Sequence, residues 1–489
     1  MTESDREHSS RAWEWSPDEI RRVGYRAVDL IADHLTRIRE EPVFRPFPRD
    51  RARQFLEEGL PETGASADRL LDDFARDVSP FPFGNGHPRF YGWVNSPPVP
   101  IGVFAEALAA AMNPSCAGGN HAAIYVERQV LNWFKELVQF PATSMGLLVS
   151  GGSMAALTAL AVARHAKCGF DVRAHGLQGE SPRLICYRTA EAHACHQKAV
   201  ELLGIGHEHF RMVPHNDALQ MVPAALDVAI ETDVAHGHMP IAVVANAGTV
   251  NTGAIDPLDE IADICAKHGT WLHVDAAYGG PAILSRSYAK NLAGLSRADS
   301  VALDPHKWLY IPVEAGLVLV RNPEVMRAAF SLVPPYLRTD GEIDGIGGPP
   351  WFSEYGIQQT RGFRALKVWM ALRYHGIAGY RASIERDIAL ADTLAASLRA
   401  APDFELFEPR SLSIVCFRYL ANRSDDLPNI DALNRTLLEQ VQLGGRAFLS
   451  STVINGRFWL RACLVNPRSS ESDVLSLLEV LREAAAGIT

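Results

Sequence analysis

Two short stretches of this sequence place an acid and an amine where both could act on one bound ligand. Asp275 opens the run Asp-Ala-Ala-Tyr-Gly-Gly, whose small residues leave room for a flat molecule close to the backbone. Lys307 follows 307 − 275 = 32 residues later, between His306 and Trp308. A lysine in such surroundings is recessed and able to lose its proton, as an amine nucleophile must. Taken singly, the two would be a structural acid and a surface charge.

A third stretch, Ser150-Gly151-Gly152-Ser153, directly precedes an expected helix over residues 154–166. Glycines at a helix N-terminus let free backbone amides approach an anion, and Ser153 adds a hydroxyl donor. The stretch is neither a P-loop nor a dinucleotide fingerprint, because Gly-Lys-Ser/Thr and Gly-x-Gly-x-x-Gly are both missing. Alone it would be a tight turn, but beside an acid and an amine it predicts a phosphate cradle.

His193 supplies a flat imidazole in Thr-Ala-Glu-Ala-His-Ala-Cys-His. The histidine pairs 193/196, 207/209 and 236/238 lack a third ligand and match no zinc spacing, so we expect no metal site. A nucleophilic Cys195 is disfavoured because nothing in its neighbourhood suggests a thiolate pocket.

A phosphate cradle, an amine, an acid and an imidazole together predict a site for pyridoxal phosphate. The lysine condenses with the aldehyde of this cofactor, and the carboxylate keeps the pyridine nitrogen protonated, which makes the ring an electron sink. At about 4 Å and an effective dielectric constant near 20, that ion pair is worth about 4 kcal/mol.

The elements that must position these residues follow from short apolar runs that alternate with helical segments such as residues 258–267. This alternation predicts an α/β fold with a mostly parallel sheet covered on both faces, where ligands lie beyond the carboxyl ends of the strands. We expect strands at residues 146–149, 183–187, 241–245, 271–274, 300–303 and 317–320.

The chain divides into three expected parts. Residues 1–85 form a helical arm, in which Ser16-Pro17-Asp18-Glu19 is a capping box and an apolar stripe runs on to Ile38. This arm docks on its own chain or on another subunit. Residues 86–375 form the large ligand-binding domain. Residues 376–489 form a small α+β domain, in which Asn455-Gly456 predicts a type I′ hairpin turn.

Composition sets limits on what this chain is. Of its 489 residues 47% are hydrophobic, and the net charge is 47 − 57 = −10, which argues against disorder and against nucleic acid as a partner. The seven cysteines include no Cys-x-x-Cys pair, as in reduced thiols. The first ten residues are polar, and no apolar run reaches the roughly 18 residues of a spanning helix. We therefore expect a cytoplasmic protein without a membrane segment.

His-Val-Asp-Ala-Ala-Tyr at 273–278 followed by Asp-Pro-His-Lys-Trp at 304–308 resembles the group II pyridoxal-phosphate decarboxylases, the family of aromatic-L-amino-acid decarboxylase. The resemblance covers most of the chain, including residues 361–369. It implies a fold-type I homodimer with its active site at the subunit interface. By motif, Lys307 would hold the cofactor, Asp275 would pair with the pyridine nitrogen, His193 would stack on one ring face and Ala277 would lie against the other. Phosphate contacts would come from Gly152, Ser153 and His306, and a hydroxyl contact from Thr249 or from no residue of 249–252.

Tyr336, in Pro-Pro-Tyr-Leu at 334–337, sits where the mobile catalytic loop of this family carries a tyrosine, shortly before a segment rich in Gly and Pro at 341–356. The resemblance implies that it protonates Cα after carbon dioxide leaves; a hydrophobic loop anchor is the alternative. Related aldehyde synthases commonly replace this tyrosine with phenylalanine, or replace the stacking histidine. Keeping both Tyr336 and His193 favours simple decarboxylation.

Residues 87–96 resemble the substrate pocket of the family. Phe90 and Trp93 would line an aromatic pocket and Ser96 would meet the substrate carboxylate, although the aromatic residues fit core packing equally well. Asp304 departs from the asparagine of many animal and plant members, so this acid must point away from the phosphate or be paired. We expect decarboxylation of an aromatic L-amino acid to its amine. The alternatives are an aldehyde synthase, an acidic-amino-acid decarboxylase, for which no dedicated arginine is evident, and a scaffold protein without cofactor.

Overall fold

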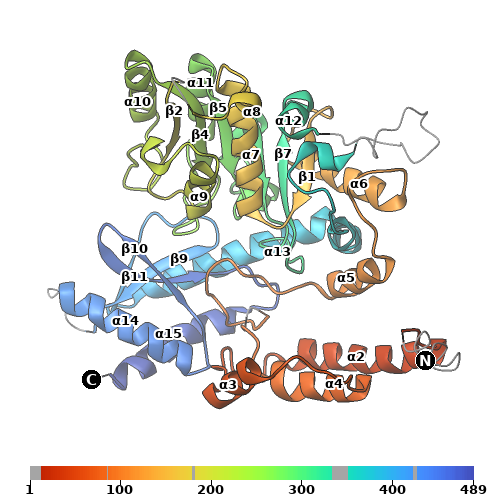
Figure 1. The fold of residues 1–489 in the computed structure, drawn as a ribbon. Helices are drawn as coiled ribbons and strands as arrows, with labels where there is room; N and C mark the ends of the chain where they lie inside the picture. The colour runs from red at the N-terminus through yellow and green to blue at the C-terminus, as the bar shows by residue number, and fades with distance from the viewer. Residues whose placement is uncertain (1–12, 85, 179–181, 333–350, 422–426, 489) are drawn as a thin grey trace, which may run out of the picture.

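The structure is a computed structural model that describes residues 13–84, 86–178, 182–332, 351–421 and 427–488. It contains a seven-stranded sheet and a four-stranded sheet, with a helical arm that lies beneath both in Figure 1. The arm, the larger sheet and the smaller sheet follow one another along the chain, as predicted. The domain boundaries given above stay a prediction.

The larger sheet has the strand order β1-β7-β6-β5-β4-β2-β3. Its pairs β6/β5, β5/β4, β4/β2 and β2/β3 are parallel, whereas β7 runs antiparallel to both β1 and β6. The predicted strands are confirmed, and so is a mostly parallel sheet. Its strands are β1 Met145–Val149, β2 Leu184–Arg188, β3 Phe210–Met212, β4 Met239–Asn246, β5 Trp271–Asp275, β6 Ser300–Leu303 and β7 Gly316–Val320.

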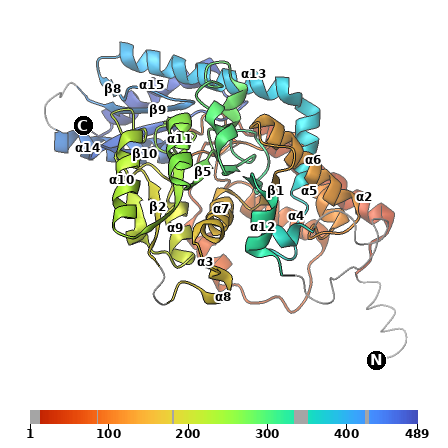
Figure 2. The same ribbon diagram turned by 90° about the horizontal axis from the view of Figure 1, so that it is seen from above.

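Helices cover this sheet. The long helix α7 contacts β4, β5, β6 and β7, and α10 and α11 pack together beside β4; Figure 2 shows α7 end-on among its neighbours. The helix predicted at 258–267 is confirmed as α11. The helices are α5 Pro100–Met112, α6 Ala122–Leu137, α7 Gly152–Lys167, α8 Val172–His175, α9 Ala194–Leu202, α10 Pro223–Ala235, α11 Leu258–His268 and α12 Pro323–Phe330, with 3₁₀ turns at His207–His209, Gly280–Leu284, Ala293–Arg297 and Phe352–Tyr355.

The helix α13, Ala365–Ala400, joins the two sheets. It bends at Gly376, whose φ of 63° is left-handed, and it contacts α5 and α6 as well as β8, β9 and α15. The small sheet is antiparallel in the order β10-β11-β9-β8. Positive φ angles of 51° at Asn455 and 75° at Gly456 confirm the predicted hairpin turn. The remaining elements are β8 Phe404–Leu406, β9 Ile414–Tyr419, α14 Leu427–Leu443, β10 Ser450–Ile454, β11 Arg457–Cys463 and α15 Glu471–Ala486.

The arm consists of α2 Pro17–Arg37, α3 Arg49–Glu57 and α4 Ala67–Asp73, followed by a π turn at Phe74–Val78. Ser16 caps α2, because its side chain accepts a hydrogen bond from the Glu19 amide. The second bond of the predicted capping box is missing, because the Glu19 carboxylate forms an ion pair with Arg22 instead. No residue of α2 is buried. The linker after α2 docks on the small domain, where the Val43 amide donates to the Gly445 carbonyl.

The carboxyl ends of β1, β2, β4, β5 and β6 lie at one edge of the larger sheet, because these strands are mutually parallel. β7 begins at this edge, and its first residue, Gly316, touches the turn after β1: a Cβ there would lie 2.3 Å from the Gly151 Cα. In the described residues, no helix is long and apolar enough to cross a membrane.

Candidate active site

A cavity of about 570 Å³ opens at this edge of the sheet. Its wall comes from the segments that follow β1, β2, β4, β5 and β6, together with the stretch around Trp93. The structure thus brings together most of the side chains singled out in the sequence. Those that line the cavity are Trp93, Gly152, Ser153, His193, Thr249, Asp275, Ala277, His306 and Lys307.

Asp275 is the last residue of β5, so its carboxylate projects at the strand end. Oδ1 accepts the Ala277 amide at 3.0 Å, and Oδ2 lies 3.7 Å from His196 Nε2. Burial alone would raise the pKa of this carboxyl, but the electrostatic influence of His196 and Lys307 and the hydrogen bond from the Ala277 amide outweigh burial and hold the pKa below its usual range. Asp275 is therefore ionised at neutral pH, as an acid that faces a protonated pyridine nitrogen must be.

Lys307 lies after β6 with its side chain only 25% exposed, and its Nζ is 3.0 Å from Asp304 Oδ2. Burial alone would lower the pKa of this amine, but Asp304 and Asp275 outweigh burial and raise it. The expectation that a recessed lysine here would lose its proton is therefore wrong for the cofactor-free protein. Asp304 is buried and paired with the lysine, which is one of the two arrangements expected for this acid. Whether it also contacts the phosphate stays a prediction.

The turn before α7 forms a corner suited to an anion. Gly151 has a φ of +156°, and α7 begins at Gly152 without a side-chain cap. The amides of Met154 and Ala155 donate to the Gly151 carbonyl, so those of Gly152 and Ser153 are the ones that can meet an anion. A Cβ on Gly152 would lie 3.0 Å from Asp304 Oδ2 and 3.3 Å from the Ala277 Cβ. The His306 ring borders the same turn, since a Cβ on Gly151 would lie 3.2 Å from its Cε1. These residues fit a phosphate group.

His193 precedes α9 and caps it, since its Nδ1 accepts the Cys195 amide at 3.2 Å. That hydrogen bond fixes the orientation of the ring at the cavity wall. Burial is the largest influence on the His193 pKa and lowers it, so the imidazole is neutral at neutral pH. A neutral, fixed, flat ring is suited to stacking on an aromatic ligand.

The three residues expected in a substrate pocket have different surroundings. Phe90 is 2% exposed and stacks on Phe448 at 4.8 Å between ring centroids, which is the core-packing alternative. Trp93 is 43% exposed and lines the cavity. Ser96 is buried, and its hydroxyl donates to the backbone carbonyl of Lys307. In this structure the Ser96 hydroxyl proton is therefore used by the Lys307 backbone. It is not free for the expected contact with a substrate carboxylate.

Thr249 lines the cavity, but its hydroxyl is engaged within its own loop: it accepts the Ala254 amide at 3.1 Å and lies 3.2 Å from the Thr252 hydroxyl. Tyr336 lies outside the described residues, and so do residues 341–350 of the Gly- and Pro-rich segment. The expected catalytic role of this tyrosine, the protonation of Cα, and the alternative of a hydrophobic loop anchor both stay predictions.

Sequence reasoning missed Arg461, which ties the cavity to the small domain. This β11 arginine is 3% exposed; its Nη1 donates to the Trp93 carbonyl at 2.9 Å and its Nε to the Asn251 carbonyl at 3.0 Å. The sequence signal for Arg461 was a charged residue inside the apolar run of β11.

His196 was considered solely as a metal ligand, and its position behind Asp275 went unrecognised.

Comparisons with known proteins agree with this geometry. The family model of the pyridoxal-dependent decarboxylase conserved domain matches residues 48–420. An aromatic-L-amino-acid decarboxylase of Bacillus atrophaeus is 36% identical over 476 residues, which cover 97% of each chain. A phenylacetaldehyde synthase of a Rosa hybrid cultivar is 27% identical over 96% of this chain and 95% of its own. The crystal structure of Oryza sativa TDC with PLP and tryptamine superposes with a TM-score of 0.89 at 27% identity, covering 97% of this chain and 100% of that chain.

Proposed function

This chain belongs to the pyridoxal-dependent decarboxylase family, and we propose that it converts an aromatic L-amino acid into the corresponding amine and carbon dioxide. The observation that carries the proposal is the meeting of Lys307, Asp275 and the uncapped start of α7 in one cavity. In this arrangement the amine is complementary to the aldehyde of one cofactor, the carboxylate to its pyridine nitrogen and the anion corner to its phosphate.

Pyridoxal phosphate would be held by the residues of that cavity. Lys307 would bind the aldehyde carbon, Asp275 would face the pyridine nitrogen, and the first amides of α7 with Ser153 and His306 would hold the phosphate. When bound, this cofactor withdraws electrons from Cα of the amino acid and so stabilises the charge left when carbon dioxide departs.

The remaining steps belong to side chains of the protein. Asp304 keeps the Lys307 amine protonated in the cofactor-free protein, because its Oδ2 lies 3.0 Å from Nζ, so this proton must leave before the amine can attack an aldehyde. The neutral His193 ring would hold the cofactor flat. Tyr336 would deliver the proton to Cα, which gives the amine and disfavours oxidation to the aldehyde.

An aromatic substrate is supported by the wall of the cavity. Trp93 lines the cavity, is 43% exposed and stacks on Phe83, with 5.2 Å between the ring centroids. The described residues that line the cavity include no arginine to meet a second carboxylate. This composition favours phenylalanine, tyrosine, tryptophan or dihydroxyphenylalanine over an acidic amino acid.

The test is a panel of amino acids given to the purified holoenzyme, with carbon dioxide, amine, aldehyde, ammonia and peroxide measured together. Amine and carbon dioxide in equal amounts from an aromatic substrate support the proposal. Aldehyde with ammonia and peroxide would identify an aldehyde synthase instead. Lys307→Ala should abolish the visible absorbance of the bound cofactor; a band that persists in this variant would contradict the lysine assignment.

We also propose that the protein is a homodimer with its active site at the subunit interface. The arm supports this because it presents apolar side chains to solvent: Ile20 is 56% and Tyr25 is 68% exposed on α2, and Leu70 is 57% exposed on α4. A second copy would cover this surface. Sedimentation of the full chain should give twice the mass of one chain, and Ile20→Asp should reduce this mass; a monomeric wild-type protein would refute the proposal.

The expected cytoplasmic location is tested by cell fractionation.

A further inference from the structure

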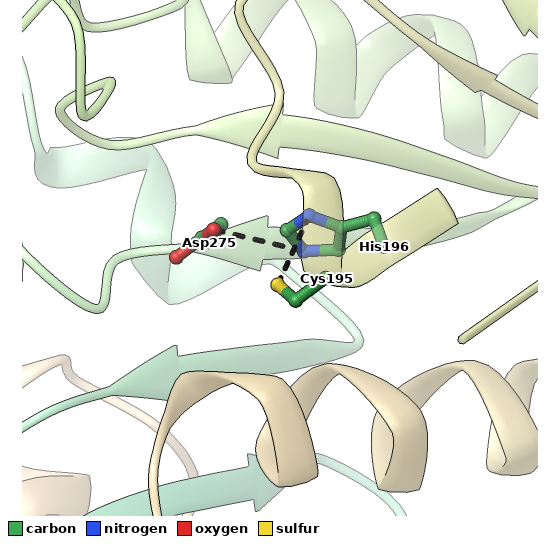
Figure 3. A group of neighbouring side chains, drawn as sticks. All are labelled: Cys195, His196 and Asp275. Carbon is green, nitrogen blue, oxygen red and sulfur yellow. Dashed lines mark hydrogen bonds and ion pairs between the residues drawn. The ribbon is translucent and has the colours of Figure 1, made fainter. Parts of the chain in front are cut away.

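Behind the carboxylate of Asp275 lies a cluster of three side chains that the proposed function does not use in full. Figure 3 shows Cys195 and His196 at the start of α9, facing Asp275 at the end of β5. His196 Nε2 lies 3.7 Å from Asp275 Oδ2, and His196 Nδ1 lies 3.7 Å from Cys195 Sγ. The cluster therefore connects the floor of the cavity to a helix end.

His196 is completely buried, and its two ring nitrogens have different surroundings. Nδ1 lies 3.1 Å from the backbone carbonyl of His193, an acceptor that fixes the ring. Nε2 has no hydrogen-bond partner among the described residues, and it faces the carboxylate of Asp275. A buried polar atom without a partner is rare and requires an explanation.

A second histidine behind this ring is neutral and so does not compete for the carboxylate. Trp271 Nε1 donates to Ser300 Oγ at 2.8 Å, so the one hydroxyl proton of Ser300 is free to reach His273 Nδ1 at 2.9 Å. His273 Nδ1 therefore accepts. Burial, the largest influence, lowers the pKa of His273 to about 3, in agreement with a neutral ring.

We propose that His196 is a positioning residue that holds Asp275 in the orientation needed to face the pyridine nitrogen of pyridoxal phosphate. With both ring nitrogens protonated, Nδ1–H toward the His193 carbonyl and Nε2–H toward Asp275, Nε2–H would attract Oδ2 while the Ala277 amide holds Oδ1. The carboxylate would then be fixed at both oxygens. This inference rests on the role proposed above for Asp275. At 3.7 Å the contact is electrostatic and longer than a hydrogen bond.

Two other roles for the cluster fit less well. The ligand atoms of Cys195, His196 and Asp275 lie within 4.8 Å of one another, but a metal ion here would occupy the carboxylate that faces the cavity. A thiolate nucleophile is opposed by burial, which raises the pKa of Cys195 to about 12. The positioning role uses the histidine without either conflict.

The experiment compares His196→Gln with His196→Asn in the purified full-length protein. The Gln amide nitrogen occupies the position of Nε2 and keeps an N–H donor toward Asp275. The Asn amide nitrogen occupies the position of Nδ1, so no donor faces Asp275. Cofactor affinity is measured by titrating the stripped protein with pyridoxal phosphate and following fluorescence, without substrate. We expect His196→Asn to weaken the affinity about tenfold, equivalent to about 1.4 kcal/mol, and His196→Gln to stay within about threefold of wild type.

A second readout is the pH dependence of the visible absorbance of the bound cofactor. The groups around Asp275 that also carry or gain charge are Lys307, Asp304, His193, His273 and Cys195. His196→Asn should shift this titration, and His196→Gln should restore it, because the donor to Asp275 is then retained. A residue that merely fills space would not give this rescue.

Control variants separate failure of this inference from failure of the proposed function. Asp275→Asn should weaken cofactor affinity more than either His196 variant; if it leaves affinity and absorbance unchanged, the role of Asp275 itself is wrong. If Asp275→Asn acts but both His196 variants behave like wild type, or lose affinity equally, the positioning role is refuted. Stoichiometric metal in the wild-type protein that disappears in His196→Asn would also refute it. Thermal unfolding of the cofactor-free variants identifies any that fail to fold.

Discussion

Replacing Asp304 with asparagine should make the cofactor-free protein bind pyridoxal phosphate faster at neutral pH. Asp304 Oδ2 lies 3.0 Å from Lys307 Nζ, and this pairing raises the pKa of the lysine. An amine attacks an aldehyde in its neutral form. The buried acid therefore reduces the fraction of Lys307 that is ready to react, and Asp304→Asn removes that restraint with little change in shape.

The magnitude follows from the distance between the two charges. At 3.0 Å and an effective dielectric constant near 20, their attraction is about 5.5 kcal/mol. Desolvation of both groups offsets much of this attraction, and Asp275 still acts on Lys307 in the variant. A net loss of about 1.4 to 2.7 kcal/mol corresponds to a fall of about one to two units in the lysine pKa. The neutral fraction, and with it the rate of cofactor binding, should then rise about 10- to 100-fold at pH 7.

Stopped-flow absorbance of the stripped protein mixed with pyridoxal phosphate measures this rate between pH 6 and 10. The wild-type rate should rise with pH until Lys307 loses its proton, and the variant should reach its plateau at lower pH. Because the folded lysine pKa is raised, the ion pair stabilises the cofactor-free fold at pH 7 and ceases to do so as pH passes that pKa. Asp304→Asn should therefore also lower the free energy of unfolding at pH 7 by about 1 to 3 kcal/mol.

Glu314→Gln is the matched control for this experiment. Glu314 also lines the cavity, but its carboxylate is engaged by Arg364, with 2.6 Å between Oε1 and Nη2. This variant should bind the cofactor at the wild-type rate. The reasoning is refuted if Asp304→Asn keeps the wild-type rate and pH profile, or if Glu314→Gln accelerates binding equally.

Three further predictions concern the frame of the site. Arg361→Met should lower the free energy of unfolding in urea by about 3 to 5 kcal/mol, because it leaves the fully buried Glu127 carboxylate unpaired; adding Glu127→Gln should recover part of this loss. Burial raises the pKa of Asp387 to about 6, so the fold loses stability as pH rises from 4 to 6; Asp387→Asn should remove up to about 3 kcal/mol of that loss, measured by unfolding at both pH values. Gly152→Ala should weaken cofactor affinity more than about tenfold, because its Cβ would lie at the start of α7, 3.0 Å from Asp304 Oδ2, and narrow the corner proposed for the phosphate; thermal unfolding checks that the variant folds, and tight binding by it would contradict the phosphate corner.

Six strands of the larger sheet, all but β3, could be predicted because they are buried on both faces and therefore consist mostly of apolar residues. β3 could not be predicted in this way. Phe210–Met212 is three residues long and lies at the sheet edge, where Arg211 is partly exposed and Met212 is exposed. Its position depends on pairing with β2, which a run of three residues does not encode.

The site could be predicted as far as residue type and strand order allow. Asp275 ends β5 and Lys307 follows β6, and these strands are neighbouring and parallel, so the sheet brings both residues to one cavity. Hydrogen-bond partners are not fixed by strand order. Ser96 lies 211 residues from the Lys307 carbonyl to which its hydroxyl donates, and 79 residues separate His196 from Asp275, by 275 − 196. Such pairs are formed by the packing of segments distant in sequence, so a local motif does not predict them.

The surroundings of Asp304 show why its charge, and not its size, is the feature to test. A Cβ on Gly316 would lie 2.7 Å from Asp304 Oδ1, and one on Gly152 would lie 3.0 Å from Oδ2, so two glycines enclose the carboxylate on both sides. An asparagine has the same shape and fits the same enclosure. The two glycines therefore cannot distinguish acid from amide, whereas the lysine 3.0 Å away can. Any change in cofactor binding in Asp304→Asn thus reports on the charge that faces Lys307.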